Sequence, residues 1–189
     1  MRLTFDLDDV IFNMKPLYKE AFKRVGLPYT KQTSWDIASI YDEKVVNNLI
    51  DLWSSDLLYS MPVLDIGMPY IINDLMARDD MDIYFVTERR LKQPEKSFQQ
   101  LQNAGIKCNF NQVIDRHGFK SDILKELKTD LHFDDSPFVV RGCLDKNIPV
   151  VMISNNNTIY NHHLRGDVEH YKNLRTALIK KGIYNPKNR

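Results

Sequence analysis

Short apolar runs alternate with helical patterns along most of the chain. Each run is bounded by polar or turn-forming residues, which is typical of a strand buried in a sheet. Between the runs, apolar residues recur at the spacing of one helical face. We therefore expect strands near Arg2–Asp6, Ile83–Val86, Asn111–Ile114, Leu131–Phe133 and Val150–Ile153.

The alternation of strands and helices predicts the fold class. Repeated strand–helix units favour an α/β fold with a doubly wound parallel sheet, in which the crossovers between strands are right-handed. In such a sheet, ligands bind beyond the carboxyl ends of the strands, where the strand order reverses. Helices are expected near Pro94–Asn103, Ser121–Leu127 and Glu169–Lys180.

The first crossover is much longer than the others and should carry structure of its own. We interpret residues 14–67 as a small helical cap inserted after the first strand, and residues 1–13 and 68–189 as the core domain. A cap over the strand ends would exclude water and supply specificity. Apolar stripes predict helices at Lys15–Val25 and Asp42–Trp53, and the chain is expected to return to the core through a helix near Tyr70–Ala77.

The composition is that of an ordinary globular enzyme. The chain has 189 residues, 43% of them hydrophobic, which suits one core domain with a modest insert. The 26 Lys and Arg residues nearly balance the 25 Asp and Glu residues, so a small substrate is favoured over a nucleic acid or an anionic membrane. The two cysteines, Cys108 and Cys143, stand in unlike sequence contexts, which suits unpaired thiols in a reducing compartment. Because the sequence shows no secretory leader and no apolar run of membrane length, we expect a cytoplasmic protein. Whether it forms a homodimer is left open.

Two carboxylates, Asp6 and Asp8, follow the first predicted strand. Side chains two residues apart on an extended segment point to the same side, so these carboxylates are expected to converge beyond the strand end. Close carboxylates repel each other and are tolerated mainly around a cation or a proton. Mg²⁺ is often bound by one or two carboxylates together with substrate phosphate. The pair therefore indicates a phosphoryl-transfer site, although acidic pairs are also common in loops and caps.

Other polar residues stand at the ends of later elements. Thr87 ends one predicted strand, Lys120 stands at a helix start, and Asp134 and Asp135 follow another strand. Each has a plain structural interpretation, as a strand end, a solvated lysine or a helix cap. Their occurrence in this order after the first acidic pair favours one shared site, because the carboxyl ends of parallel strands meet at one edge of the sheet.

The series of motifs resembles the four motifs of the haloacid-dehalogenase-like phosphohydrolases, over the stretch from Asp6 to Asp135. Within that superfamily the chain most resembles the 5'(3')-deoxyribonucleotidases. Three features point to this branch: Val10 where many relatives carry Thr, the short helical insert, and the tripeptide Val140–Gly142 after the second acidic pair. Outside the motifs the likeness is loose.

The resemblance implies a two-step mechanism. Asp6 would attack phosphorus and form an aspartyl-phosphate, while Asp8 would protonate the leaving oxygen and then deprotonate the attacking water. Lys120 would neutralise charge on the phosphoryl group and on Asp6. Thr87 and the backbone N–H groups after it, at Glu88 and Arg89, would hold phosphate oxygens.

The resemblance also implies a Mg²⁺ site. Its ligands would be Asp6, the backbone carbonyl of Asp8, and Asp135. Asp134 is expected to contact these ligands rather than the metal. Which of Asp134 and Asp135 binds the metal directly is left open. The chain departs from the family at Asp9, where Gly is usual. Asp tolerates the left-handed backbone region, so the loop can form, with the Asp9 side chain facing away or capping a following helix.

Aromatic residues of the insert are candidates for contacts with a nucleobase. Tyr59 stands where the nucleotidase family uses an aromatic against the base, and Trp35 is a second candidate. Tyr18 and Trp53 lie on helical stripes and are expected to pack in the core.

Three functions are open on this sequence. The leading one is Mg²⁺-dependent hydrolysis of deoxyribonucleoside monophosphates, which are small phosphate monoesters, with no stable nucleic-acid partner and no membrane. The second is removal of 3'-phosphates from polynucleotide ends, which Arg89 and Arg90 would suit but the neutral charge and the helical cap suit less. The third is a catalytically silent phosphate-binding module. Asp8 argues against it, because a proton-transfer group has little purpose in mere binding.

Overall fold

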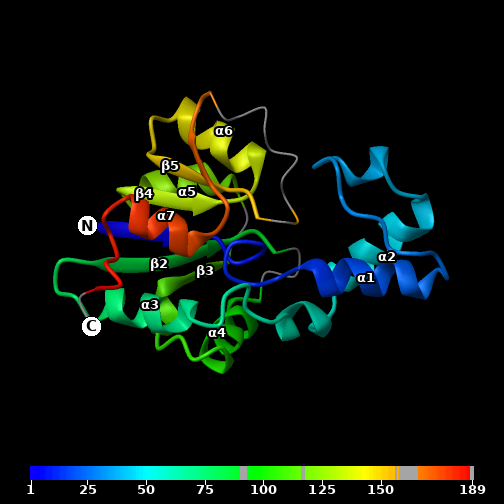
Figure 1. Ribbon diagram of the computed structural model, residues 1–189, viewed down its shortest axis with the longest axis horizontal. Helices are drawn as coiled ribbons and strands as arrows, with labels where there is room; N and C mark the ends of the chain where they lie inside the picture. Colours follow the sequence, from blue (N-terminus) through cyan, green and yellow to red (C-terminus); the bar gives the residue numbers. More distant parts are fainter. Residues whose placement is uncertain (90–92, 116–117, 156, 158–165, 188–189) are drawn as a thin grey trace.

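Six parallel strands form a single sheet in the computed structural model of the protein (Figure 1). The structure describes residues 1–89, 93–115, 118–155, 157 and 166–187. The strand order is β3-β2-β1-β4-β5-β6, and all neighbouring strands pair in parallel. The strands are β1 (Arg2–Phe5), β2 (Asp82–Thr87), β3 (Val113–Asp115), β4 (Leu131–Asp134), β5 (Val150–Ile153) and β6 (Glu169–Tyr171).

The sheet is doubly wound, as the sequence predicts. From β1 the chain adds β2 and β3 on one side, and then β4, β5 and β6 on the other. The strand order therefore reverses between β1 and β4, and the carboxyl ends of these two strands flank the place where such sheets bind ligands.

Helices cover both faces of the sheet, and the burial pattern of β5 shows why both are needed. Val151 and Ile153 belong to one apolar cluster, and Val150 and Met152 belong to the other. Because alternate side chains of a strand point to opposite faces, both faces must be shielded from water. The first cluster includes α3 (Met68–Met76), α4 (Pro94–Asn103) and α7 (Leu174–Lys180), and the second includes α5 (Lys120–Glu126) and α6 (Pro137–Asp145).

The long first crossover forms a helical lobe beside the sheet (Figure 1). Its two α-helices pack against each other, and the rings of Tyr18 and Trp53 meet edge to face at 5.9 Å. The two chain segments that enter and leave the lobe are hydrogen bonded, since Asn13 N donates to the Pro62 carbonyl at 2.8 Å. A separate cap domain at residues 14–67 stays a prediction. The lobe consists of α1 (Lys15–Arg24), the 3₁₀ turn η1 (Ile37–Ser39), α2 (Glu43–Trp53) and the 3₁₀ turn η2 (Asp56–Ser60).

One sequence-based element is wrong. The predicted helix at Glu169–Lys180 is a short edge strand, β6, followed by α7. Asn173 separates them, because its side chain caps α7 by accepting a hydrogen bond from Thr176 N at 2.8 Å. A smaller shift occurs before β3, where Phe110–Gln112 form the 3₁₀ turn η3 and the strand begins at Val113 rather than Asn111.

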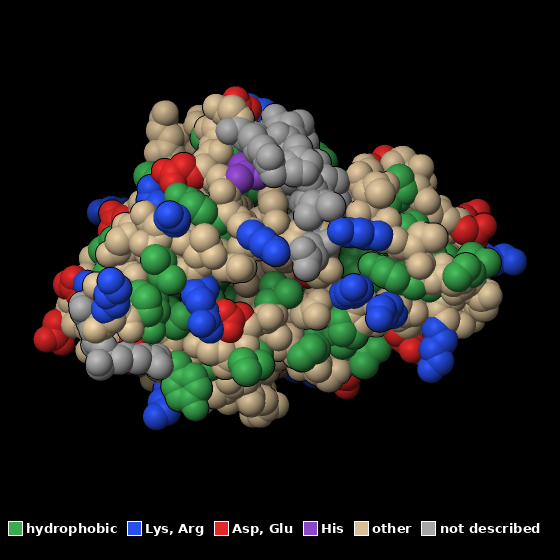
Figure 2. Space-filling model, in the orientation of Figure 1, with side chains coloured by type: hydrophobic (Ala, Val, Ile, Leu, Met, Phe, Trp, Pro, Cys, Tyr) green, Lys and Arg blue, Asp and Glu red, His purple; other side chains and the backbone are tan. Residues whose placement is uncertain are grey.

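The surface agrees with the balanced composition. Basic and acidic side chains are interspersed across the face shown in Figure 2. Within the described part of the chain, no helix is both long enough and apolar enough to cross a bilayer.

Candidate active site

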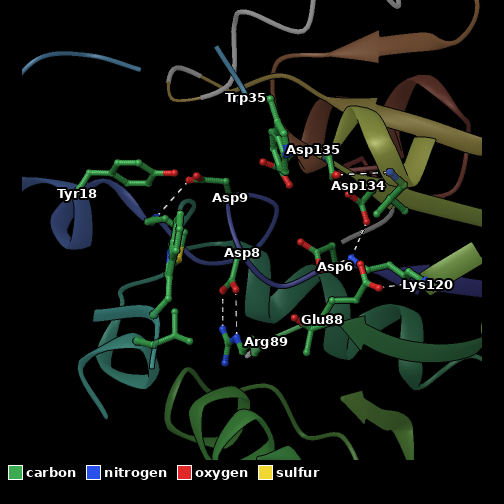
Figure 3. A pocket seen from close by; sticks show the side chains of 16 residues that line it. Asp6, Asp8, Asp9, Tyr18, Trp35, Glu88, Arg89, Lys120, Asp134 and Asp135 are labelled. Atoms are coloured by element: carbon green, nitrogen blue, oxygen red, sulfur yellow. Dashed lines mark hydrogen bonds and ion pairs between the residues drawn. The ribbon is translucent and has the colours of Figure 1, made fainter. Parts of the chain in front are cut away.

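A cavity of about 270 Å³ opens at the carboxyl ends of β1, β2 and β4, at the reversal of the strand order. Polar residues from the sheet line one part of it, and side chains of the helical lobe line another. The sequence places several candidate site residues at these strand and helix ends, and the structure brings them together here. Figure 3 labels the polar and aromatic lining residues Asp6, Asp8, Asp9, Tyr18, Trp35, Glu88, Arg89, Lys120, Asp134 and Asp135.

Asp6 follows β1 directly and is 5% exposed. Its backbone N–H donates to the Phe133 carbonyl at 3.0 Å, which joins it to β4. Its carboxylate accepts a hydrogen bond from Lys120 Nζ at 2.7 Å. Burial raises the pKa of Asp6 to about 7, because the effect of Lys120 is offset by the neighbouring carboxylates Asp134 and Asp8.

Lys120 is the first residue of α5 and is 4% exposed. Its Nζ lies 2.7 Å from Asp6 and 2.8 Å from Asp134. Burial opposes its charge, but these two carboxylates outweigh burial and raise the pKa of Lys120. The backbone N–H of Lys120 donates to the Glu88 side chain at 3.2 Å. Lys120 is therefore a fixed cation inside the site rather than a solvated lysine.

Asp134 has hydrogen-bond partners on both carboxylate oxygens. Oδ2 accepts from Lys120 and lies 2.9 Å from His132 Nε2, and Oδ1 accepts from Ser136 N at 2.8 Å. Burial alone would raise the pKa of Asp134, but Lys120 and His132 lower it to about 2. His132 was missed by sequence reasoning. Burial lowers the pKa of its ring. Nδ1 lies 2.8 Å from the Thr4 hydroxyl and 3.1 Å from the Thr4 carbonyl, and Nε2 faces Asp134.

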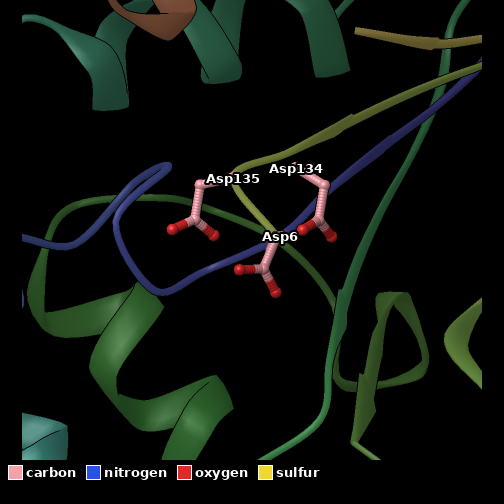
Figure 4. A group of neighbouring side chains, drawn as sticks. All are labelled: Asp6, Asp134 and Asp135. Atoms are coloured by element: carbon pink, nitrogen blue, oxygen red, sulfur yellow. The ribbon is translucent and has the colours of Figure 1, made fainter. Parts of the chain in front are cut away.

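Three buried carboxylates form a candidate metal site. Asp6, Asp134 and Asp135 each offer an oxygen within 4.8 Å of the others (Figure 4). Burial, then the nearby Asp9, raises the pKa of Asp135 well above its usual range. One lysine faces three carboxylates, and this excess of buried negative charge fits a divalent cation with hard oxygen ligands. Asp134 is held by Lys120, His132 and Ser136, and direct ligation by Asp6 and Asp135 stays a prediction.

Asp8 lies apart from this cluster. Its carboxylate pairs with Arg89, with Nη2 at 2.6 Å from Oδ1 and Nε at 3.2 Å from Oδ2 (Figure 3). The two strand-end carboxylates therefore face different cations, Lys120 for Asp6 and Arg89 for Asp8. A metal contact through the backbone carbonyl of Asp8 stays a prediction.

Asp9 adopts the left-handed conformation expected of it, with φ of 54°. Its carboxylate accepts from Met14 N at 3.2 Å, just before α1, and from Asn157 Nδ2 at 2.7 Å. Burial raises the pKa of Asp9 to about 6. These bonds tie the loop after β1 to the start of the helical lobe.

The remaining candidates occupy different positions around the cavity. Thr87 is buried at the end of β2 and lines the cavity with Glu88. Tyr59 is not among the lining residues, and its ring lies on Arg89, 5.1 Å from ring centroid to Cζ. Arg90 lies outside the described residues. Stacking by Tyr59 on a base stays a prediction.

Aromatic side chains of the lobe, Tyr18, Trp35 and Trp53, form an aromatic wall of the cavity. Trp35 lines the cavity and meets Phe138 of α6 at 6.3 Å between ring centroids. Tyr18 and Trp53 pack on each other, as expected, but they also line the cavity. Helical periodicity identifies such residues as buried, and it does not show that one edge of the packed pair faces a cavity.

Comparison with known proteins identifies the fold. No family model matches the chain, and no curated protein matches it. Solved structures do: a haloacid dehalogenase-like family hydrolase from Streptococcus pneumoniae has a TM-score of 0.64 at 14% identity, over 95% of this chain and 97% of that chain. A predicted phosphatase from Clostridium acetobutylicum has a TM-score of 0.62 at 15% identity, over 96% and 97%.

A third similar structure was determined with magnesium bound. It is YfnB from Bacillus subtilis, with a TM-score of 0.58 at 12% identity, covering 95% of this chain and 97% of that chain. The chain thus has the haloacid-dehalogenase-like fold over nearly its whole length.

Proposed function

We propose that the protein is a Mg²⁺-dependent phosphatase that hydrolyses deoxyribonucleoside monophosphates, as a 5'(3')-deoxyribonucleotidase does. The observation that carries the proposal is the contact of Asp6 with Lys120 inside a buried carboxylate cluster at the reversal of the strand order. The similar hydrolase and phosphatase structures share this fold, which supports the same class of reaction.

In the first step, an Asp6 oxygen attacks phosphorus while the bond from phosphorus to the leaving oxygen breaks. Asp8 gives its proton to that oxygen, so a neutral alcohol leaves. Lys120 stabilises the negative charge that gathers on the phosphoryl oxygens. Thr87 and the backbone N–H groups that follow it orient the same oxygens. The products of this step are the nucleoside and an aspartyl-phosphate on Asp6.

In the second step, water attacks the phosphorus of the aspartyl-phosphate. Asp8, now ionised, takes a proton from this water, and the bond between phosphorus and the Asp6 oxygen breaks to release phosphate. Mg²⁺ would be held by Asp6 and Asp135, and it would supply charge neutralisation and orientation of the phosphoryl group. Lys120 remains bound to Asp134 throughout, which keeps its ammonium group beside Asp6.

The aromatic wall supports a substrate that carries a planar base. Trp35 and Trp53 line the cavity on the side of the lobe, and Met14 and Val139 add apolar surface. A nucleobase that stacks on an aromatic ring gains about 1–3 kcal/mol with little dependence on the base. A deoxyribonucleotide would therefore present its phosphate to the carboxylates and its base to the lobe.

The experiment is phosphate release from a matched substrate set, with Mg²⁺ and with a chelator. The set contains deoxyribonucleoside and ribonucleoside monophosphates, p-nitrophenyl phosphate, and an oligonucleotide with a 3'-phosphate. Turnover of the deoxy monophosphates that is lost with chelator is the expected result. Preference for the oligonucleotide would move the substrate to DNA ends, and no turnover of any substrate would overturn the proposal.

Asp6→Asn tests the nucleophile. We expect loss of turnover with the fold intact, because an amide oxygen is a poor nucleophile. Asp79→Asn is the matched control. Asp79 is exposed and precedes the start of β2 at Asp82, whereas the cavity lies at the end of that strand. Activity of Asp6→Asn within about tenfold of the wild type would exclude Asp6 as nucleophile.

A further inference from the structure

Arg89 is buried at the edge of the cavity, and most of its hydrogen-bond capacity is already used. Its side chain is 1% exposed. Nε and Nη2 donate to the two oxygens of Asp8, and Nη1 donates to Gln100 Oε1 at 2.8 Å and to Ser97 Oγ at 3.2 Å. A guanidinium has five N–H groups, so four are engaged in these contacts. Little capacity remains for a phosphate unless Arg89 releases Asp8.

The chain segment that leaves the helical lobe holds Arg89 from the other side. Tyr59 places its ring 5.1 Å from the guanidinium carbon, in the range of a cation–π contact. Gln100, which accepts from Arg89, donates through Nε2 to the carbonyls of Leu58 at 3.4 Å and Met61 at 3.3 Å. Residues 58–61 are therefore linked to Arg89 by a ring contact and by one shared amide.

We propose that Arg89 is a positioning residue that fixes the carboxylate of Asp8, and that residues 58–61 hold Arg89 in that position. The inference rests on the proposed function, in which Asp8 exchanges a proton with the leaving oxygen. The two parallel hydrogen bonds from the planar guanidinium of Arg89 hold the Asp8 carboxylate in one orientation. Each carboxylate oxygen keeps a second lone pair, and one of these can carry the proton that Asp8 exchanges with the leaving oxygen. The packing of residues 58–61 against Arg89 thereby sets the orientation of Asp8, which exchanges a proton with the leaving oxygen.

This role differs from a phosphate-binding role for Arg89 and from a base-stacking role for Tyr59. A phosphate ligand would chiefly affect KM, for every substrate. A stacking residue would affect only substrates that carry a base. A residue that positions Asp8 affects formation of the aspartyl-phosphate, which kcat/KM reports, and it does so most for leaving groups that need a proton.

The first test compares Arg89→Lys and Arg89→Met with the wild type. Lys keeps the charge and loses the fork, and Met loses both. Arg175→Lys is the matched control, because Arg175 makes the same two-point contact with Asp65, at 2.6 and 2.7 Å, outside the cavity. The substrates are deoxyribose 5-phosphate, which has a poor leaving group, and p-nitrophenyl phosphate, which has a good one.

For both Arg89 variants we expect kcat/KM on deoxyribose 5-phosphate, which reports formation of the aspartyl-phosphate, to fall about 10- to 100-fold, with kcat/KM on p-nitrophenyl phosphate changed less than about threefold. Arg175→Lys should leave both rates unchanged. Equal loss on both substrates, or a loss confined to KM, would overturn the positioning role.

The second test uses Tyr59→Phe and Tyr59→Leu on a deoxyribonucleotide and on deoxyribose 5-phosphate, which share the leaving oxygen and differ in the base. The Tyr59 hydroxyl is buried without a hydrogen-bond partner among the described residues, so Phe should behave as the wild type. Leu removes the ring and should lower kcat by a similar factor on both substrates. A loss seen only with the base present, and in KM, would instead establish stacking by Tyr59.

A measurement without turnover separates this inference from the proposed function. Urea unfolding of Asp8→Asn, Tyr59→Leu and the double variant should give a coupling of at least about threefold in the unfolding constant, because Arg89 contacts both residues. The cycle of Tyr59→Leu with Asp65→Asn should give none. Coupling in a protein that hydrolyses none of the substrates would leave the positioning role standing and reject the phosphatase. Turnover of deoxyribonucleotides without coupling would reject the positioning by residues 58–61 alone.

Discussion

Replacing Asp6 by Asn should stabilise the metal-free protein, whereas the same change at Asp134 should destabilise it. Both carboxylates are buried, and both accept a hydrogen bond from Lys120. They differ in their other neighbours. Asp134 is also held by His132 and Ser136, while Asp6 faces the like charges of Asp134 and Asp8. An uncompensated buried charge costs stability, and a compensated one contributes to it.

The pKa values give the magnitude. The pKa of Asp6 rises from 3.8 to about 7, a difference of about three units, and each unit corresponds to about 1.4 kcal/mol. Ionised Asp6 therefore costs up to about 4 kcal/mol at pH 8. Asn keeps the oxygen that accepts from Lys120 but adds a buried amide N–H₂, so a net gain of about 2 kcal/mol is expected. The pKa of Asp134 falls from 3.8 to about 2, so its loss should cost about 2 kcal/mol at the same pH.

The two effects have opposite pH dependence. A carboxyl with a raised folded-state pKa binds its proton more tightly when folded, so wild-type stability should fall as pH rises from about 4 to about 7. The advantage of Asp6→Asn should therefore shrink as pH is lowered from 8 to 5. The contribution of Asp134 is present above about pH 4 and is lost as pH falls toward 2.

Urea unfolding in chelator at pH 8 measures both effects. With a slope near 2 kcal/mol per molar urea, the midpoint should rise by about 1 M for Asp6→Asn and fall by about 1 M for Asp134→Asn. Asp79→Asn, at an exposed position, should not shift it. If Asp6→Asn proves less stable than the wild type at pH 8, or if its effect is the same at pH 5, the electrostatic argument for the cluster is wrong.

Three further predictions concern ligands and substrates. Mg²⁺ at about 100 times its dissociation constant should raise the free energy of unfolding of the wild type by about 2.7 kcal/mol, and that of Asp135→Asn far less, as measured by urea unfolding with and without chelator. Trp35→Ala should raise KM for deoxyribonucleotides about 5- to 100-fold by loss of stacking, with p-nitrophenyl phosphate turnover retained; equal losses would make Trp35 structural. Asp8→Asn should lower kcat/KM about 10²- to 10⁴-fold on nucleotides and much less on p-nitrophenyl phosphate, and equal losses of kcat/KM in steady-state assays would remove its role as proton donor to the leaving oxygen.

The central strands were predictable because each is a short apolar run with clear boundaries. β4 and β5, for example, are buried along their whole length. The edge strand β6 was not, because Glu169, His170 and Tyr171 carry no apolar run and are only partly buried or exposed. Its identity depends on pairing with β5, which local sequence does not encode.

The candidate site was predictable as far as strand and helix ends determine it. Asp6 and Asp135 directly follow strands and Lys120 begins a helix, and a parallel sheet brings such ends together. The contact of Asp8 with Arg89 was not predictable, because it depends on a side-chain direction after β2. His132 carried one usable signal, since it stands two residues before Asp134 in an apolar strand and so shares its face.

The pairing register of β1 and β4 connects the fold to the chemistry. Thr4 pairs with His132, and Phe5 with Phe133, so the next positions along the two strands bring Asp6 beside Asp134. A slip of one residue would turn every side chain to the opposite face of the sheet and separate the two carboxylates from their shared Lys120. The stacked rings of Phe5 and Phe133, 5.2 Å apart, oppose such a slip from within the apolar core. The hydrogen bond between Thr4 and His132 opposes it as well, because a slip would leave buried polar atoms without partners. The same packing that stabilises the centre of the sheet therefore holds Asp6 at the distance from Lys120 that the proposed reaction requires.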